Sequence, residues 1–201
     1  MIEMNELIEG FSDLFGEQNI QPWEIINNVS SILANKILSL SDEYNIDNGM
    51  AIHKTAVIES NVILKPPVII GPECFIGANA YIRGGVWLTG HVTIGTGCEI
   101  KSAVIFPNSA IAHFNFIGES IIGRNVNFEA GSVTANHYNE RKDKTIIVCY
   151  HSSIIKTNTH KFGSLVGDDS KIGANAVLSP GTILARGTIV KRLGLVDQSV
   201  H

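Results

Sequence analysis

The chain has 201 residues, enough for one domain with a sizeable core, or for one domain and a small addition. Its net charge of -4 gives no basic field for nucleic acid, and no apolar run approaches the roughly 20 residues that span a membrane. The N-terminal stretch MIEMNELIEG is acidic where a signal peptide would be basic. We therefore expect a cytoplasmic protein with no nucleic-acid or membrane partner.

Residues 1–50 predict helices. Apolar residues between Leu7 and Phe15 recur at helical spacing, and Pro22 suits the first turn of a second helix whose apolar stripe continues to Leu40. A repetitive β-structure needs a polar-faced cover over its open end, so we expect these helices to form a small N-terminal cap on the segment that follows. Binding of a partner is the alternative role.

Residues 51–201 are dominated by a six-residue repeat. Its large inward positions are expected at Ile52, Ile58, Leu64, Ile70, Ile76, Ile82, Leu88, Ile94, Ile100, Phe106 and Ala112, then Ile117, Ile122, Phe128 and Thr134, and finally Val166, Ile172, Leu178, Leu184 and Val190. Small or β-branched residues two positions earlier, such as Cys74, Cys98 and Val104, should also point inward. This period predicts an all-β solenoid, a left-handed parallel β-helix of hexapeptide repeats with six to seven coils of about 18 residues.

An insertion interrupts the repeat between residues 135 and 165. Because both flanks return to register, this segment must leave the coil, and we expect a projecting loop at about 137–163. Its run TIIVCYHSSII is typical of two short strands. Such loops in repeat proteins cluster at binding faces.

Four polar residues before the insertion are candidates for chemistry. Arg83 and Lys101 are 18 residues apart, so they should stack one coil apart, and a stacked cation pair suits an anionic ligand such as a phosphate ester. Pairing with nearby acids such as Glu99 is the structural alternative. His113 lies in the stretch AHFNFIGES, where two consecutive steps of the repeat shorten to five residues, and imidazole is a common general base near neutral pH. A purely structural or solvent-facing histidine is its alternative.

The stretch AHFNFIGESIIGRNVNFEAGSVTANHYNERKDKT carries a family resemblance. It resembles the acetyltransferase domain of the bifunctional glucosamine-1-phosphate acetyltransferase / N-acetylglucosamine-1-phosphate uridylyltransferase family, whose members show His-x-x-Tyr-x-Gly-Asp, then Val-Asn-x-Gly-Ala-Gly-Thr, then Asn and a Lys-containing loop. The resemblance covers about residues 50–190. It looks closest to the archaeal sugar-phosphate nucleotidylyltransferase–acyltransferase branch, where the loop after the Asn is also long.

The resemblance implies a role for each matching residue. His113 falls on the catalytic base, Glu99 on the acidic residue near it, and Asn136 on the residue that positions the acceptor or the thioester. The implied acceptor-binding residues are Arg83 and Lys101 for the sugar phosphate, Asn127 for the sugar, Phe116 in place of a phosphate-holding Tyr, and Lys142, with Lys144, Lys156 and Lys161 as competitors. The implied acetyl-CoA contacts are Ala174, Arg186, Lys191 and Arg192.

The implied function is transfer of an acetyl group from acetyl-CoA to the amine of an amino sugar 1-phosphate, in nucleotide-sugar biosynthesis. The family implies a homotrimer with sites shared between chains and no metal. Phe116 and Glu129 depart from the family pattern, so acyl transfer to another sugar acceptor and a non-catalytic role as a subunit or scaffold remain open. No Gly-x-Gly-Thr-Arg phosphate loop occurs, so no nucleotidylyltransferase activity is expected. No His-x-x-x-x-His pair supports a metal-dependent carbonic anhydrase on the same fold.

Overall fold

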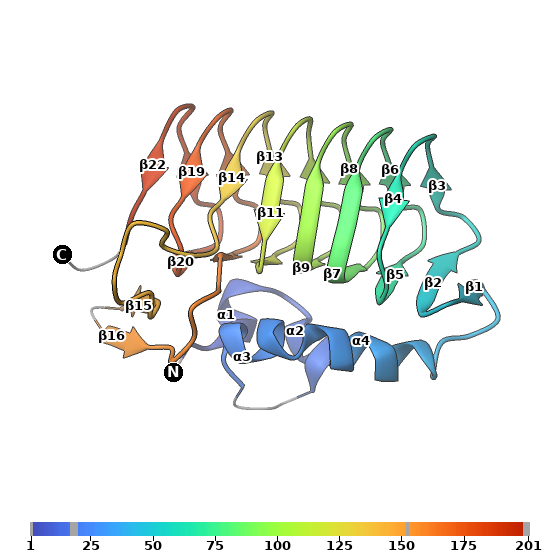
Figure 1. Ribbon diagram of the computed structural model, residues 1–201, viewed down its shortest axis with the longest axis horizontal. Helices are drawn as coiled ribbons and strands as arrows, with labels where there is room; N and C mark the ends of the chain where they lie inside the picture. Colours follow the sequence, from blue (N-terminus) through green and yellow to red (C-terminus); the bar gives the residue numbers. More distant parts are fainter. Residues whose placement is uncertain (1, 17–19, 152, 199–201) are drawn as a thin grey trace.

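The computed structural model describes residues 2–16, 20–151 and 153–198, and it shows a three-sided solenoid with helices along one side (Figure 1). The solenoid is a left-handed parallel β-helix, as the six-residue repeat predicts. Val57 pairs with Phe75 and Phe75 pairs with Thr93, so equivalent residues recur every 18 positions. In the described residues, one side is a sheet of seven strands.

The three sides differ in what surrounds them. The groove face, which holds a surface groove, consists of β3 (Val57–Ile58), β6 (Phe75–Ile76), β8 (Thr93–Ile94), β10 (Ala110–Ile111), β13 (Asn127–Phe128), β18 (Lys171–Ile172) and β21 (Ile189–Val190). The open face consists of β4 (Ile63–Leu64), the first halves of β7 (Tyr81–Leu88) and β9 (Glu99–Ile105), β11 (Phe116–Gly118), β14 (Val133–Thr134), β19 (Val177–Leu178) and β22 (Leu195–Val196). The covered face, beneath the helices, consists of β2 (Met50–His53), β5 (Val68–Ile70), the second halves of β7 and β9, β12 (Ile121–Ile122), β17 (Ser164–Val166) and β20 (Thr182–Leu184). β1 (Tyr44–Asp47) pairs antiparallel with β2 at the N-terminal end.

The described residues of the N-terminal segment fold into four short helices, which are α1 (Met4–Leu7), α2 (Phe11–Phe15), α3 (Pro22–Asn27) and α4 (Val29–Ile37). Pro22 starts α3 as predicted, and Glu24 accepts a 2.8 Å hydrogen bond from the Gln21 backbone N–H, which completes a capping box. Within the described part of the chain, no helix is long and apolar enough to cross a membrane.

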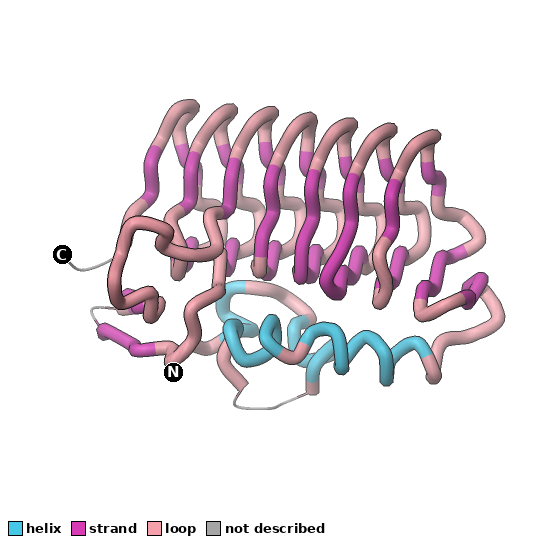
Figure 2. The backbone as a smooth tube through the Cα atoms, in the orientation of Figure 1, coloured by secondary structure: helices cyan, strands magenta, loops and turns pink. Residues whose placement is uncertain are grey.

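The helices do not cap the end of the solenoid, contrary to the prediction. They run along its side, over the covered face (Figure 2). The outward residues of that face are apolar on successive coils, namely Ile69, Trp87, Val104, Ile121, Leu165 and Ile183. They form one buried cluster with the apolar sides of the helices. Removing this apolar row from water favours lateral docking, because burial stabilises in proportion to the apolar area.

The predicted inward register is correct up to Ile100, is one residue off at the next two positions, and is correct again from Ile117 onward. Ile105, not Phe106, points into the solenoid, and Ile111 follows in place of Ala112. The five-residue steps therefore run from Ile100 to Ile105 and from Ile117 to Ile122. They are not consecutive, and neither of them contains His113. Ala103 likewise takes the small inward position predicted for Val104. The sequence is ambiguous here because both sides of this strand are buried, so Phe106 packs against the helices and alternation is lost.

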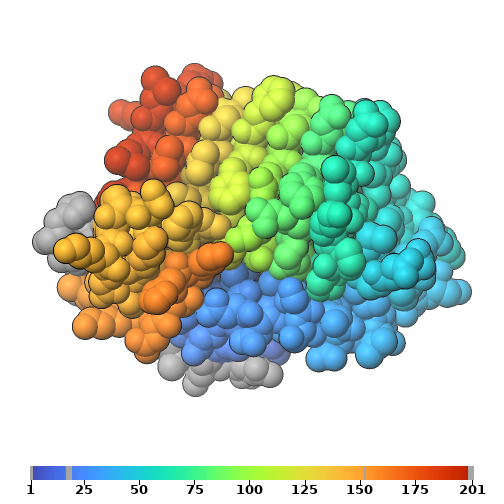
Figure 3. All heavy atoms as spheres, viewed as in Figure 1, coloured from blue at the N-terminus to red at the C-terminus, as the bar shows by residue number. Residues whose placement is uncertain are grey.

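The insertion forms the predicted pair of strands. β15 (Ile147–Tyr150) and β16 (Ser153–Lys156) make an antiparallel hairpin. The segment does not simply project, because Ile146, Val148 and Phe162 are buried in the same cluster as the helices. The Phe162 ring meets the Trp23 ring edge-on at 6.0 Å between centroids. Figure 3 shows the insertion, in gold and orange, next to the blue helical layer.

Candidate active site

Two basic side chains stack on the edge where the open face meets the covered face. Arg83 and Lys101 are direct neighbours in the parallel pairing of β7 with β9, as their spacing of one coil predicts. Gly84 and Ser102 follow them and turn the chain with left-handed φ angles of 73° and 46°. The Ser102 hydroxyl donates a 2.7 Å hydrogen bond to the Gly84 carbonyl, which ties the two turns together.

Each of these cations has its own carboxylate partner. Arg83 lies 2.8 Å (Nε) and 2.6 Å (Nη2) from Oε1 of Glu99, and Lys101 Nζ donates to Oε1 of Glu119. Nearby acids thus balance the charge of both cations, which is what the structural alternative for this pair predicts. The side chain of Arg83 is 36% exposed and that of Lys101 is 15% exposed. An anion arriving at this edge would therefore meet Arg83 first, which still has unused N–H donors.

Glu119 lies at the centre of the more buried cluster on this edge. Its carboxylate accepts hydrogen bonds from Lys101 on the preceding coil and from the Asn136 side-chain amide on the following coil. Asn136 Oδ1 lies 3.1 Å from His137 Nδ1, at the point where the insertion leaves the solenoid. The sequence reasoning did not single out Glu119. It occupies the acidic position of the family's Gly-Asp step, and that match was the available signal.

His113 lies on a different edge, where the groove face meets the open face. Its side chain is exposed, and its backbone carbonyl accepts a 2.9 Å hydrogen bond from the Gly131 N–H. A Cβ atom at Gly95 would come within 3.1 Å of His113 Nδ1, so the imidazole lies against a glycine of the preceding coil. An exposed imidazole with an open approach can exchange protons with a bound molecule.

Glu99 does not orient His113 within one chain, contrary to the role implied for it. Its carboxylate is engaged by Arg83, and no hydrogen bond or ion pair joins it to His113 in residues 2–16, 20–151 and 153–198. Glu99 pairs in register with Phe116 on the open face, between the two edges. The open face therefore brings together five of the predicted residues, namely Glu99 and Phe116 on the face, His113 on one edge, and Arg83 and Lys101 on the other.

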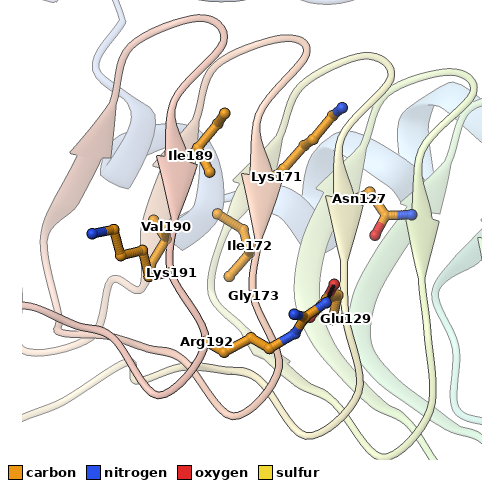
Figure 4. Close-up of a pocket in the computed structure, with 9 residues that line it drawn as sticks. All are labelled: Asn127, Glu129, Lys171, Ile172, Gly173, Ile189, Val190, Lys191 and Arg192. Carbon is orange, nitrogen blue, oxygen red and sulfur yellow. Dashed lines mark hydrogen bonds and ion pairs between the residues drawn. The ribbon is translucent and has the colours of Figure 1, made fainter.

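Asn127 and two of the four predicted acetyl-CoA contacts lie elsewhere, in a groove of about 490 Å³ on the groove face (Figure 4). Glu129, Lys191 and Arg192 line it with Asn127, and so does Lys171, which the sequence reasoning missed. Within the described ranges, neither Lys171 nor Lys191 has a carboxylate within 4.0 Å. This groove offers two ammonium groups without an ion-pair partner.

One ion pair spans the wall of the groove. Arg192 donates from Nε and Nη2 to the two carboxylate oxygens of Glu129 at 2.7 and 2.6 Å, and the backbone N–H of Ala174 donates to Glu129 Oε2 at 2.8 Å. These hydrogen bonds, that of Arg192 first, lower the pKa of Glu129 below its usual value, and the pair raises the pKa of Arg192. The charge that Glu129 adds to the family pattern is thus balanced locally.

Comparisons with known proteins agree with this architecture. The family model described as GMPPB C-terminal domain matches residues 66–147, and the model for the hexapeptide repeat of succinyl-transferase matches residues 165–191. The bifunctional protein GlmU of Methanococcus maripaludis is 37% identical over 184 residues, which are 89% of this chain and 44% of that protein. A bifunctional sugar-1-phosphate nucleotidylyltransferase/acetyltransferase of Sulfurisphaera tokodaii is 33% identical over 88 residues, 44% of this chain and 21% of that protein. The chain thus spans less than half the length of either relative.

The chain carries a GlmU-like hexapeptide-repeat domain. Among solved structures, a candidate acetyltransferase of Bacillus cereus shares the fold, with a TM-score of 0.53 and 12% identity over 70% of this chain and 71% of that one.

Two residues implied by the GlmU-like pattern lie away from both the open face and the groove. Arg186 is on the edge between the covered and groove faces, where it binds Asp168 at 2.5 Å and approaches Glu9 of the N-terminal segment at 3.6 Å. It joins the helical layer to the solenoid, so the structure does not support it as an acetyl-CoA contact in the groove. Lys142 is exposed in the insertion, and Lys161 is exposed where the insertion returns next to Asn136.

Proposed function

We propose that this chain transfers an acetyl group from acetyl-CoA to the amine of an amino sugar 1-phosphate. The observation that carries the proposal is the arrangement of the open face, whose two edges present an exposed histidine and a stacked arginine–lysine pair. The relatedness to GlmU and to a sugar-1-phosphate nucleotidylyltransferase/acetyltransferase supports a sugar acceptor.

Arg83 and Lys101 are the proposed phosphate-binding groups. Arg83 has donors left over from its pair with Glu99, and planar guanidinium donors match phosphate oxygens well. A phosphate at this edge would orient the sugar across the open face toward His113, past Phe116. Because Phe116 has no hydroxyl, the phosphate would be held by the cations and by Asn136.

His113 is the proposed general base. As the acceptor nitrogen attacks the thioester carbonyl carbon, the imidazole takes a proton from the nitrogen, a C–N bond forms, and the C–S bond breaks to release coenzyme A thiolate. The proton on His113 can then pass to that leaving sulfur. General-base assistance of this kind contributes about 10²–10⁴-fold to the rate. A backbone N–H near His113 would stabilise the oxyanion, because the Asn136 amide lies on the other edge with Glu119 and Lys101.

The groove is the proposed site for the anionic part of acetyl-CoA. Lys171 and Lys191 have no ion-pair partner in the described residues, and Arg192 is already oriented by Glu129. Phosphate groups of the donor would satisfy these cations. Acetyl-CoA supplies the activated thioester, and the chain supplies its binding and orientation.

A homotrimer would complete the site. In one chain the groove and the acceptor-side residues lie on different faces, so two chains are needed to bring a donor against His113. Both faces carry exposed apolar side chains, including Ile63 and Leu195 on the open face and Ile189 on the groove face, which are 52%, 69% and 73% exposed. Association would bury them. Light scattering should give three times the chain mass of 21.7 kDa.

The proposal is tested by a radiolabelled acetyl-CoA assay on a panel of amino sugar 1-phosphates, including the glucosamine and galactosamine forms. The wild-type chain should acetylate at least one of them, and His113→Ala should lower kcat by about 10²–10⁴-fold without changing the oligomeric mass. His91→Ala, which changes an exposed histidine of the groove-face edge, is the matched control. Transfer to none of these acceptors, or full activity of His113→Ala, would overturn the proposal.

One observation favours a second candidate, transfer to a sugar acceptor without a phosphate. Glu99 and Glu119 balance Arg83 and Lys101, so the cluster of these four groups carries no net charge. A panel that contains the same amino sugars with and without the 1-phosphate separates the two. If the phosphate-free sugars are the better substrates by kcat/KM, the second candidate is correct.

A further inference from the structure

Glu119 joins two residues that the proposed function assigns to the acceptor. Its carboxylate accepts a hydrogen bond from Lys101 on one coil and from Asn136 on the next. The two partners are 35 positions apart in the sequence, and only this side chain is seen to bridge them in the described residues. Its own side chain is 8% exposed.

The backbone at Glu119 is also constrained. Its φ angle is 42°, in the left-handed region where glycine and asparagine cost less than glutamate. Several other positive-φ turns of the solenoid use asparagine, as at Asn79, Asn108 and Asn125. The Glu119 carbonyl accepts a 2.9 Å hydrogen bond from Gly163, the residue at which the chain returns from the insertion. The carboxylate is therefore held at a constrained, buried point of the edge.

We infer that Glu119 is a positioning residue for the acceptor, which fixes the Lys101 ammonium and the Asn136 amide relative to each other. This inference rests on the proposed function. A buried ammonium without a counter-ion is costly, so without Glu119 the Lys101 side chain would turn toward solvent. The Asn136 amide would lose the acceptor that orients it. Both groups would then have to be ordered by the acceptor itself, which weakens binding.

The test compares Glu119→Gln and the milder Glu119→Asp with the wild type in steady-state kinetics. Glu119→Gln keeps the size of the side chain but removes its charge, and we expect the KM for the acceptor to rise about tenfold, with kcat and the KM for acetyl-CoA within about threefold of wild type. Glu119→Asp keeps the charge on a shorter arm, and we expect a rise of about threefold. An unchanged or lowered acceptor KM in both variants would overturn the inference.

Asp168→Asn is the matched control. Asp168 is another buried carboxylate that bridges distant groups, with Arg186 and the backbone N–H groups of Glu9 and Arg124 as partners, but it lies on a different edge. This variant should lower the melting temperature and leave the acceptor KM unchanged. If it raises the acceptor KM as much as Glu119→Gln does, the effect is general loosening and the inference is wrong.

A second measurement does not depend on activity. Acetic anhydride labelling followed by mass spectrometry reports how accessible each lysine is. Lys101 should be labelled slowly in the wild type and in Asp168→Asn, and several-fold faster in Glu119→Gln and, to a smaller extent, in Glu119→Asp. If the wild type acetylates none of the acceptors, the proposed function fails while this labelling still tests the positioning of Lys101. Equal labelling in all four proteins would overturn the inference by itself.

Discussion

The buried edge around Glu119 and the exposed groove around Glu129 both place a carboxylate between residues of different coils, but in different surroundings. The Glu119 side chain is 8% exposed, whereas that of Glu129 is 37% exposed and that of its partner Arg192 is 72% exposed. Water and salt reach the second pair, so it contributes little to stability. The first pair is largely shielded from solvent, so losing one partner costs more. The same scaffold thus provides one fixed cluster, suited to positioning, and one that can exchange partners with a ligand.

The largest expected difference between the two clusters is the loss of stability when the carboxylate of each is removed. Glu119→Ala breaks a buried ion pair and forces the Lys101 side chain to rearrange toward solvent, and we expect the free energy of unfolding to fall by about 3–5 kcal/mol. Glu129→Ala should leave the urea midpoint unchanged, because Arg192 becomes hydrated. Urea denaturation followed by circular dichroism measures both. Equal losses in the two variants would contradict the distinction between a buried and an exposed cluster.

Affinity for acetyl-CoA should change when the carboxylate of Glu129 in the groove is removed. Glu129→Ala releases Arg192 and the Ala174 N–H next to Lys171 and Lys191, and it removes a negative charge. We expect the Kd for acetyl-CoA to fall about fivefold, the equivalent of about 1 kcal/mol. Calorimetry measures this, with Glu43→Ala, an exposed acid near Lys54, as the control. An unchanged Kd would mean that the anionic part of the donor does not bind in this groove.

Added salt should weaken acetyl-CoA binding in the groove and leave the accessibility of Lys101 at the buried edge unchanged. The screening length shortens from about 10 Å at 0.1 M salt to about 3 Å at 1 M. We expect the Kd for acetyl-CoA to rise about threefold over this range, because Lys171 and Lys191 are exposed or near the surface. The labelling rate of Lys101 should stay the same once it is referred to an exposed lysine such as Lys54. Faster labelling of Lys101 at high salt would show that its ion pair is open to solvent.

The smallest expected effect is a shift in the titration of Glu129. Because its pKa is lowered in the folded state, the contribution of this ion pair is present above the ordinary value of 4.5 and is lost as the pH falls through the lowered pKa. A carbon-13 NMR titration should give a midpoint below 4.5. In Arg192→Gln the midpoint should move back up toward 4.5, since the Arg192 hydrogen bond is the main cause of the shift. No movement would show that Arg192 does not hold this carboxylate in solution.

Regular features of the chain could be predicted because they depend on local spacing. The stacking of Arg83 on Lys101 follows from one coil of 18 residues, and the start of α3 follows from the fixed φ angle of Pro22. Both were confirmed. The hairpin of β15 and β16 was predicted in the same way, from two short apolar runs.

Errors arose where two buried environments compete for the same residues. At Ile105 and Phe106 the six-residue pattern does not distinguish a residue that faces the interior of the solenoid from one that packs against the helices. The predicted register is therefore one residue off at this point. The position of the helices is wrong in the prediction for a related reason, because the inward and outward rows of the covered face are both apolar and the pattern does not show which face the helices cover. Arg186 resembles a ligand-binding cation in sequence, and only its contact with buried Asp168 shows its structural role.

The sequence by itself determined the period, and therefore the solenoid and the order of side chains along each edge, since every coil repeats the same backbone path. Only the tertiary structure decided which carboxylate meets which cation. Glu99, Glu119 and Glu129 are equally acidic in sequence, but Glu119 lies between partners on two neighbouring coils and Glu129 reaches Arg192 from 63 positions away. Such pairings depend on distance and burial across coils, and these are set when the chain closes on itself.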